Sequence, residues 1–267
     1  MSLIHPTAVI DPQASLASTV SVGPYCVVGA DVVLDDHVQL ISHVSIGGKT
    51  HVGRGTVIYP FASLGHVPQD LKYQGEDSVL HIGSDNVIRE HVTMNPGTAG
   101  GGMITKVGSQ SLFMVGCHIA HDCYVGDHAI IANNATLGGH VVVGDHVLVG
   151  GLAAIHQFVR IGDYAVIGGA LGVERDVIPF GAVTGQRGAL NGLNWVGLRR
   201  QGFALDDIQA LRQVYHQLFG SQKVGEIQER LASIPEALGK KPCVQRLLEF
   251  LQGPTKRRFC LPEQNHD

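Results

Sequence analysis

An aliphatic side chain recurs at every sixth position from the beginning of the chain. The series is Ile4, Ile10, Leu16, Val22, Val28, Leu34, Leu40, Ile46, Val52, Ile58 and Leu64. A helix repeats after about 3.6 residues and a strand after about 2, so neither element explains this longer period. A strict period of six predicts short strands that are joined by corners and stacked on one another as a solenoid.

The period is interrupted twice and resumes each time. It returns over residues 82–94 and again from Val107 to Val173, and glycine often follows the aliphatic residue, which suits a bend. We predict that the two interruptions, residues 65–81 and 95–106, are loops inserted into the solenoid. Residues 1–190 are expected to form this repetitive domain.

The remainder of the chain changes to helical spacing. Apolar residues recur at three and four positions over residues 205–218, 224–234 and 244–251. Gly220, Pro235 and Gly253 follow these stretches as stop signals. We therefore expect a helical domain over residues 191–267 with three short amphipathic helices, and a frayed tail past residue 255.

Composition excludes several classes of protein. The chain has 267 residues, of which 44% are hydrophobic and 16% charged, and a net charge of -4, so it lacks the basic surface of a nucleic-acid protein. It shows neither a basic and apolar leader nor an apolar run of about 18 residues, and we expect a cytoplasmic protein. Five cysteines favour a reducing compartment, and Cys26, Cys117 and Cys123 stand where the repeat has small core residues.

Several of the fifteen histidines belong to the repeat. His37, His128 and His146 each follow an aspartate at the same place in a hexad, and Tyr164 follows Asp163 in the same way. We interpret these histidines as turn residues.

The hexad pattern [LIV]-G-x-x-[STAV]-x resembles that of the hexapeptide left-handed parallel β-helix, a mostly β fold. That resemblance implies coils of three hexads, one for each face of a three-sided prism. In such coils His121 takes a corner place that other coils fill with Asp127, Asp145 or Asp163. Gly139 then lies directly above His121, and Gln157 above Gly139.

This corner suits acyl transfer. A histidine can take a proton from a hydroxyl group, and an unobstructed backbone N–H at Gly139 can stabilise the oxyanion of a tetrahedral intermediate. Neither a nucleophilic cysteine nor a nucleophilic serine is required. Asp122 can orient His121 only if the pair lies in the corner, because consecutive residues of a straight strand face opposite ways.

Five segments resemble the UDP-N-acetylglucosamine O-acyltransferases of lipid A synthesis. They are residues 118–123 (HIAHDC), 133–140 (NNATLGGH), 156–158 (HQF), 69–73 (QDLKY) and 197–203 (GLRRQGF). The resemblance extends over nearly the whole chain. It implies transfer of a 3-hydroxyacyl chain from an acyl carrier protein to the 3-hydroxyl group of UDP-N-acetylglucosamine, with no cofactor besides the phosphopantetheine thioester of the donor.

The same resemblance implies a role for individual residues. His121 is the general base, and the backbone of Gly139 forms the oxyanion hole. The residues expected to contact the glucosamine are Asp70, Lys72, His118 and His140. Those expected near the nucleotide are His156, Gln157, Asn194 and Arg200.

Gly169 matches the position that measures the acyl chain in this family. A glycine there leaves the acyl slot open, which implies a longer chain such as 3-hydroxymyristoyl. Leu171 could itself narrow the slot, and a corner glycine needs no ligand to explain it.

Each of these residues also has a purely structural interpretation. His140 shares the place of the turn histidines, and His118 and His156 could be strand residues. Asp70 and Lys72 could form a solvated pair, and Arg200 could cap a helix.

Four positions differ from the family pattern: Asn95-Pro96 replaces His-Arg, Arg187 replaces a histidine, and Val196 replaces a glutamate. They leave open how the nucleotide is held and whether the acceptor carries a 3-hydroxyl or a 3-amino group.

Other functions remain possible on the same fold. These are the lipid A N-acyltransferase, an acetyl-CoA-dependent acetyltransferase, a purely structural solenoid, and a zinc-dependent hydratase, which the spacing His118-x-x-His121 brings to mind. The flat faces and the family together predict a homotrimer with sites between subunits. The acidic acyl carrier protein is expected to dock near Arg199 and Arg200.

Overall fold

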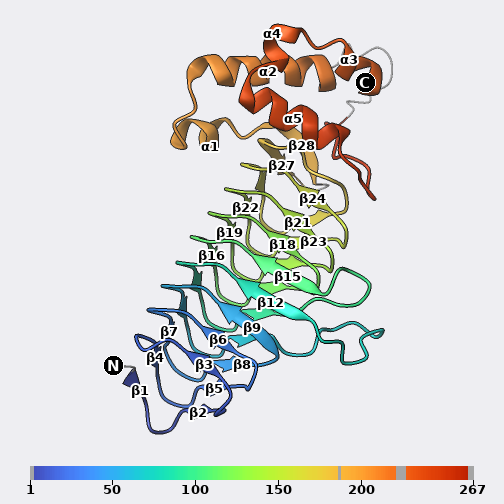
Figure 1. Cartoon of the computed structure of the whole chain (residues 1–267). Helices are drawn as coiled ribbons and strands as arrows, with labels where there is room; N and C mark the ends of the chain where they lie inside the picture. The colour runs from blue at the N-terminus through green and yellow to red at the C-terminus, as the bar shows by residue number, and fades with distance from the viewer. Residues whose placement is uncertain (1–2, 186–187, 221–226, 264–267) are drawn as a thin grey trace.

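A computed structural model describes residues 3–185, 188–220 and 227–263. The hexads form a long three-sided prism of short strands, and helices cover the end opposite the N-terminus (Figure 1). The prediction of a three-sided parallel β-helix followed by helices is confirmed.

Three sheets make up the faces of the prism. Sheet A has eleven strands: β1 (Leu3–Ile4), β4 (Ser21–Val22), β7 (Gln39–Leu40), β10 (Val57–Ile58), β13 (Val87–Ile88), β16 (Leu112–Phe113), β19 (Ile130–Ile131), β22 (Leu148–Val149), β25 (Val166–Ile167), β27 (Gly181–Thr184) and β28 (Ala189–Leu193). Sheet B has nine: β2 (Val9–Ile10), β5 (Val27–Val28), β8 (Ser45–Ile46), β11 (Ser63–Leu64), β14 (Thr93–Met94), β17 (His118–Ile119), β20 (Thr136–Leu137), β23 (Ala154–Ile155) and β26 (Gly172–Val173). Sheet C has eight: β3 (Ser15–Leu16), β6 (Val33–Leu34), β9 (Lys49–Val52), β12 (Val79–Ile82), β15 (Ile104–Val107), β18 (Tyr124–Val125), β21 (Val142–Val143) and β24 (Arg160–Ile161). Among the described strands all pairings are parallel except that of β27 with β28.

The hexad determines both the core and the corners. The second residue of a two-residue strand points inward, and Ile58, Leu64 and Ile119 are fully buried there. The third residue after it often adopts the left-handed backbone conformation, which side chains other than glycine rarely take. His128 (φ 57°) and His146 (φ 58°) are examples, and the prediction that they are turn residues is confirmed.

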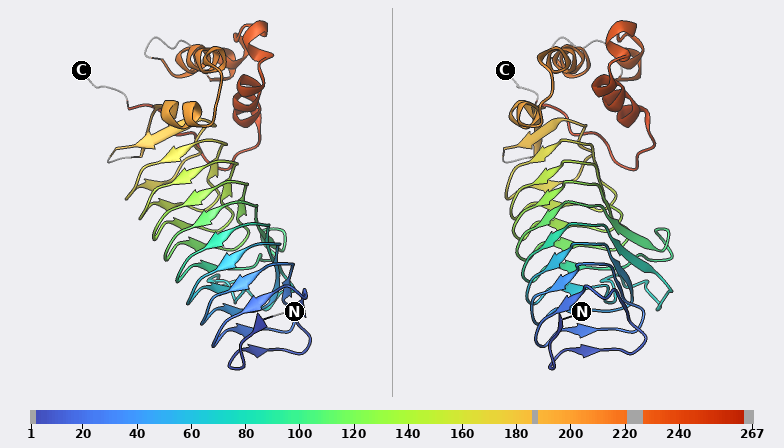
Figure 2. Two further views of the ribbon diagram at one scale, coloured as in Figure 1. Left: turned by 90° about the vertical axis from the view of Figure 1, so that its left-hand side faces the viewer. Right: turned by 60° about the vertical axis from the view of Figure 1, so that its left-hand side comes forward.

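Both inserted loops leave the prism at the same corner. Residues 65–78 connect β11 of sheet B to β12 of sheet C, and residues 95–103 connect β14 of sheet B to β15 of sheet C. The two loops project side by side from one edge (Figure 2). Strands β12 and β15 therefore begin inside the ranges that the sequence predicted to be loops.

Five helices lie in the described part of the chain, where the sequence predicted three. They are α1 (Trp195–Arg200), α2 (Leu205–Phe219), α3 (Ile227–Ala232), α4 (Glu236–Gly239) and α5 (Pro242–Gln252). The helices α1 and α4 are too short to show an apolar period. Helix α3 ends before Ile234, and Val224 lies outside the described residues.

The prediction of a frayed tail past residue 255 is wrong for the described residues. Residues 254–260, here called the C-terminal strap, run back along the prism. The N–H of Asp176 donates to the carbonyl of Arg258, and the N–H of Cys260 donates to the carbonyl of Asp176, each at 2.8 Å. The buried Asp176 carboxylate also accepts from Arg160 and from the Thr255 hydroxyl. Charged hydrogen bonds to a buried carboxylate explain why this polar segment is fixed.

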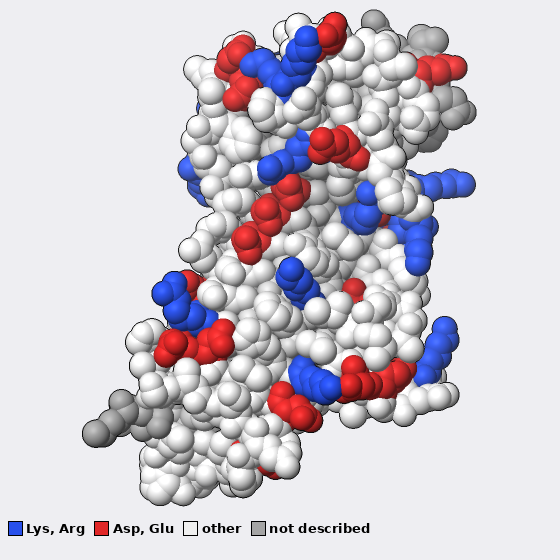
Figure 3. Space-filling view, viewed as in Figure 1, with Lys and Arg blue, Asp and Glu red and all other residues white. Residues whose placement is uncertain are grey.

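The remaining expectations concern surface and core. All five cysteines are buried, which confirms the interpretation of Cys26, Cys117 and Cys123 as core residues. Lys and Arg are interspersed with Asp and Glu on the face shown in Figure 3. Within the described residues no helix is both long and apolar enough to cross a membrane.

Candidate active site

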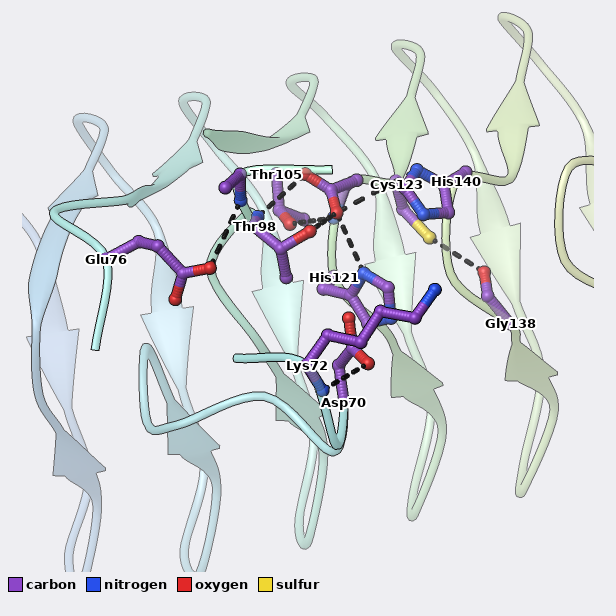
Figure 4. Close-up of polar contacts among 11 residues, drawn as sticks. Asp70, Lys72, Glu76, Thr98, Thr105, His121, Cys123, Gly138 and His140 are labelled. Carbon is purple, nitrogen blue, oxygen red and sulfur yellow. Dashed lines mark hydrogen bonds and ion pairs between the residues drawn. The ribbon is translucent and has the colours of Figure 1, made fainter. Parts of the chain in front are cut away.

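His121 and Asp122 form a hydrogen-bonded pair at the corner that leads from sheet B to sheet C, here called the BC corner. The two residues follow β17 in a turn, and Asp122 has a φ of 59°. This backbone brings consecutive side chains together, so Nδ1 of His121 lies 2.8 Å from Oδ2 of Asp122 (Figure 4). The Asp122 side chain is fully buried and that of His121 is 15% exposed. The corner position that an orienting role requires is therefore present.

Gly139 lies one coil further along the BC corner and packs on the His121 ring. A Cβ atom at Gly139 would lie 2.6 Å from Cε1 and 2.7 Å from Nε2 of His121. The neighbouring N–H groups of Gly138 and His140 bond to Ile155 and His121. The N–H of Gly139, by contrast, donates to none of the described residues, so it is available beside the Nε2 atom of the histidine.

His140 and His118 flank this pair. The His140 ring stacks on Phe158 at 4.4 Å and meets the His121 ring edge-on at 5.1 Å. His140 also has the left-handed backbone of a turn histidine (φ 62°), which confirms its interpretation as a turn residue. Nδ1 of His118 lies 2.7 Å from the Thr93 hydroxyl.

Burial lowers the pKa of both flanking histidines. The proximity of His121 lowers the pKa of His140 and of His118 further below the ordinary value. Desolvation disfavours the imidazolium form, so both rings are neutral hydrogen-bonding groups near neutral pH.

The first inserted loop places Asp70 and Lys72 beside His121 (Figure 4). The Asp70 carboxylate accepts a hydrogen bond from the backbone N–H of Lys72 at 3.0 Å. Lys72 is exposed, and within the described residues the two side chains form no ion pair.

The C-terminal strap covers the BC corner at residues 156–158, one coil beyond Gly139. Arg257 lies 2.6 Å from Nδ1 of His156 and donates through Nε to the carbonyl of Gln157 at 3.1 Å. The Lys256 ammonium lies 4.5 Å from the centre of the Phe158 ring. Sequence reasoning missed these contacts, because a basic tail without periodicity gives no signal of where it packs.

A hollow of about 480 Å³ adjoins the histidine–aspartate pair. Asp122 and His140 form one side, Gly101 of the second loop forms another, and Lys256 of the strap lies at its rim.

Three predicted residues lie on other edges of the prism. Asn194 accepts from the N–H of Gly197 and donates to the carbonyl of Tyr164, so it caps α1 near the corner from sheet C to sheet A. Arg200 ends α1 and is exposed. Gly169 lies at the corner from sheet A to sheet B, between β25 and β26. A single chain does not bring these residues to His121.

The family departures have partly structural explanations. Asn95 is nearly buried and donates to the carbonyl of His66, which ties the second loop to the first. Val196 is exposed on α1, and Arg187 lies outside the described residues.

Among the residues that the structure describes, one group of side chains could hold a metal ion. Ring nitrogens of His121 and His140 and a carboxylate oxygen of Asp122 lie within 4.8 Å of one another. His118, which prompted the zinc alternative, is not part of this group and bonds to Thr93 instead. Nδ1 of His121 and the Asp122 carboxylate bond to each other, and a metal ion would have to break that contact.

A prism of hexads with a histidine, a carboxylate and a bare glycine at one corner defines a hexapeptide-repeat transferase. The family model described as "Bacterial transferase hexapeptide (six repeats)" matches residues 104–139. The one described as "Udp N-acetylglucosamine O-acyltransferase; Domain 2" matches residues 176–260.

Relatives narrow this class to one family. An acyl-(acyl-carrier-protein)–UDP-N-acetylglucosamine O-acyltransferase of Caulobacter vibrioides is 50% identical over 98% of both chains. One of Azorhizobium caulinodans is 50% identical over 99% of this chain and 97% of its own. The solved structure of LpxA from Acinetobacter baumannii has 45% identity and a TM-score of 0.91, covering 96% of this chain and 99% of the other. This chain belongs to the UDP-N-acetylglucosamine O-acyltransferase family.

Proposed function

We propose that this protein transfers a 3-hydroxyacyl chain from acyl carrier protein to the 3-hydroxyl group of UDP-N-acetylglucosamine, the first step of lipid A synthesis. The observation that carries the mechanism is the His121–Asp122 pair beside the unpaired N–H of Gly139. Membership of the family supports the choice of donor and acceptor.

In this proposal each group has one step. We assign the proton of the neutral His121 ring to Nδ1, so that this N–H donates to the Asp122 carboxylate. Nε2 is then free to accept the proton of the sugar hydroxyl. The hydroxyl oxygen attacks the thioester carbonyl, and the N–H of Gly139 stabilises the resulting oxyanion. Collapse of this intermediate breaks the C–S bond. The imidazolium then returns its proton to the departing thiolate, so His121 ends as it began.

Asp70, Lys72, His118 and His140 bind the glucosamine in this proposal. Its support is their position around His121: two lie on the first loop, and two lie on the BC corner or its strand. The neutral rings of His118 and His140 can donate to and accept from sugar hydroxyls.

A second copy of the chain completes the site. We place His156, Gln157, Asn194 and Arg200 at the nucleotide end and propose a homotrimer. The support is that Asn194 and Arg200 lie on a different edge of the prism from His121, so an adjacent subunit has to bring them there.

Gly169 sets the length of the acyl chain in this proposal. Below it, the carbonyl oxygen of Gly151 would lie 3.0 Å from an added Cβ atom, so a side chain at Gly169 would have to project outward into the adjacent slot. Leu171, which could narrow the slot, is buried. A long donor such as 3-hydroxymyristoyl is therefore expected.

Acyl carrier protein docks near the exposed Arg199 and Arg200 at the end of α1 in this proposal, since opposite charges guide encounter. Arg199→Glu is expected to raise the KM for the carrier protein. An unchanged KM would move the docking surface elsewhere.

The decisive experiment is a transfer assay with 3-hydroxyacyl carrier proteins of several chain lengths and with UDP-N-acetylglucosamine or its 3-amino analogue. His121→Ala is expected to lower kcat by about 100-fold or more, as loss of a general base does. His37→Ala, at a distant turn, is the matched control and should retain activity. Full activity of His121→Ala would overturn the mechanism. Preference for the 3-amino analogue would overturn the choice of acceptor, and stoichiometric zinc whose removal abolishes activity would overturn the metal-free mechanism.

A further inference from the structure

The glycine-rich second loop encloses the Asp122 carboxylate. Thr98, on this loop, is 3% exposed and donates to both carboxylate oxygens: its N–H to Oδ1 at 2.8 Å and its hydroxyl to Oδ2 at 2.6 Å (Figure 4). The same Oδ2 atom faces Nδ1 of His121. Thr98 is thus linked to the proposed base, His121, through Asp122 alone, although it lies 23 positions before His121 in the chain.

Two donors on two oxygens fix the plane of a carboxylate. The last torsion of an aspartate side chain is otherwise broad, so a single bond to His121 would leave the group free to swing. A fully buried charge also needs several hydrogen bonds to offset its lost hydration. Thr98 supplies two of them, and Thr105 fixes the backbone of Asp122 by accepting its N–H at 2.7 Å.

The loop itself is shaped to make this contact. The N–H groups of Gly101 and Met103 both donate to the carbonyl of Thr98, at 3.1 and 3.0 Å. Gly101 then packs so closely on Asp122 that an added Cβ would lie 2.0 Å from its Cγ atom. At Gly100 the closest atom to an added Cβ is 3.8 Å away.

We infer that Thr98 is a positioning residue for the acyl transfer, which holds Asp122 so that its Oδ2 atom orients His121. Thr98 has this role only if the proposed function holds, because it acts through the base of that reaction.

Variants at Thr98 test the inference. Thr98→Val keeps the shape and removes the hydroxyl, and it is expected to lower kcat by about tenfold or more while KM stays within about twofold. Thr98→Ser keeps the hydroxyl and should restore most of the activity. The exposed Thr19, whose hydroxyl donates to Asp36 at 2.7 Å, offers a matched control, and Thr19→Val should behave as the unmodified protein.

A double-mutant cycle separates positioning from general support of the fold. In the Asp122→Asn background, Thr98→Val is expected to change kcat by less than about twofold, because the partner it holds is already altered. Equal losses in both backgrounds would overturn the inference, as would full activity of Thr98→Val. Thermal unfolding of each variant identifies a loss that comes from misfolding.

The loop glycines give an independent check. Gly101→Ala displaces the carboxylate and should lower kcat, whereas Gly100→Ala should not. Equal activity of the two variants would contradict the enclosure of Asp122. Absence of transfer by the unmodified protein would instead refute the proposed function, so the two failures are distinguishable.

Discussion

Gly139 and His121 constrain each other. The position tolerates no side chain, because an added Cβ would lie 2.6 Å from the imidazole. Gly139→Ala keeps the backbone N–H but is expected to displace the imidazole, and so to lower kcat by about 100-fold or more, as loss of a general base does. The measurement is the steady-state transfer rate, with unfolding curves to show that the prism is intact.

Gly29→Ala is the matched control for this substitution. An added Cβ there meets its nearest atom at an ordinary 3.5 Å, in coils distant from the site. This variant should retain its activity and stability. If Gly139→Ala is as active as Gly29→Ala, the close packing of Gly139 on the His121 ring is not required for the reaction.

Single residues of the site differed in how far the sequence could predict them. His121 was found because it takes a corner place where other coils have aspartate, and Gly139 because the repeat stacks it on His121. Thr98 could not be found in this way, since the second loop has no period and its contact with Asp122 depends on the folded path of residues 95–103.

At the level of elements, the hexad allowed the strands to be predicted nearly to the residue. Each inward aliphatic is followed by a corner, so the period alone gives the position of both. The short helices α1 and α4 were missed because the apolar residues of each extend over no more than about one helical turn. The C-terminal strap was missed because polar contacts with the buried Asp176 hold it.

A column of stacked rings at one corner is expected to make the stability of the prism depend on pH. His146 stacks on His128 at 4.5 Å and on Tyr164 at 4.6 Å. Burial, followed by the charge of His128, lowers the pKa of His146 below 6.5 despite Asp145 and Asp163. As the pH decreases below 6.5, His146 therefore binds a proton more readily in the unfolded chain than in the folded chain. The free energy of unfolding consequently decreases as the pH decreases, until the folded group is also protonated.

His146→Phe is expected to reduce this pH dependence. Phenylalanine suits the left-handed corner, because Phe61 and Phe158 already occupy the same place in other coils. Urea unfolding at about pH 7.5 and about pH 5.5 should show a smaller loss of stability in the variant than in the unmodified protein. Equal losses would mean that other groups carry the effect.

In a single chain, the residues proposed to take part in the reaction lie at different corners of the prism. The proposed base lies at the BC corner, the proposed acyl ruler Gly169 lies at a second corner, and Asn194 and Arg200 lie near the third. If three-sided prisms pack side by side, the BC corner of one subunit can meet a different corner of its neighbour at each site. The spacing of the hexads predicted a solenoid, whereas the family resemblance supplied its three-sided form and, together with the flat faces, the trimer.

Mixed oligomers test this arrangement. Chains carrying His121→Ala and chains carrying Arg200→Ala are each expected to be nearly inactive alone. In a mixed trimer, one of the three junctions joins an intact base to an intact Arg200, so about one third of the activity should return. Co-expression with two affinity tags and sequential purification isolates the mixed species. Activity no greater than that of the separate variants, or an active monomer in sedimentation, would refute a site shared between subunits.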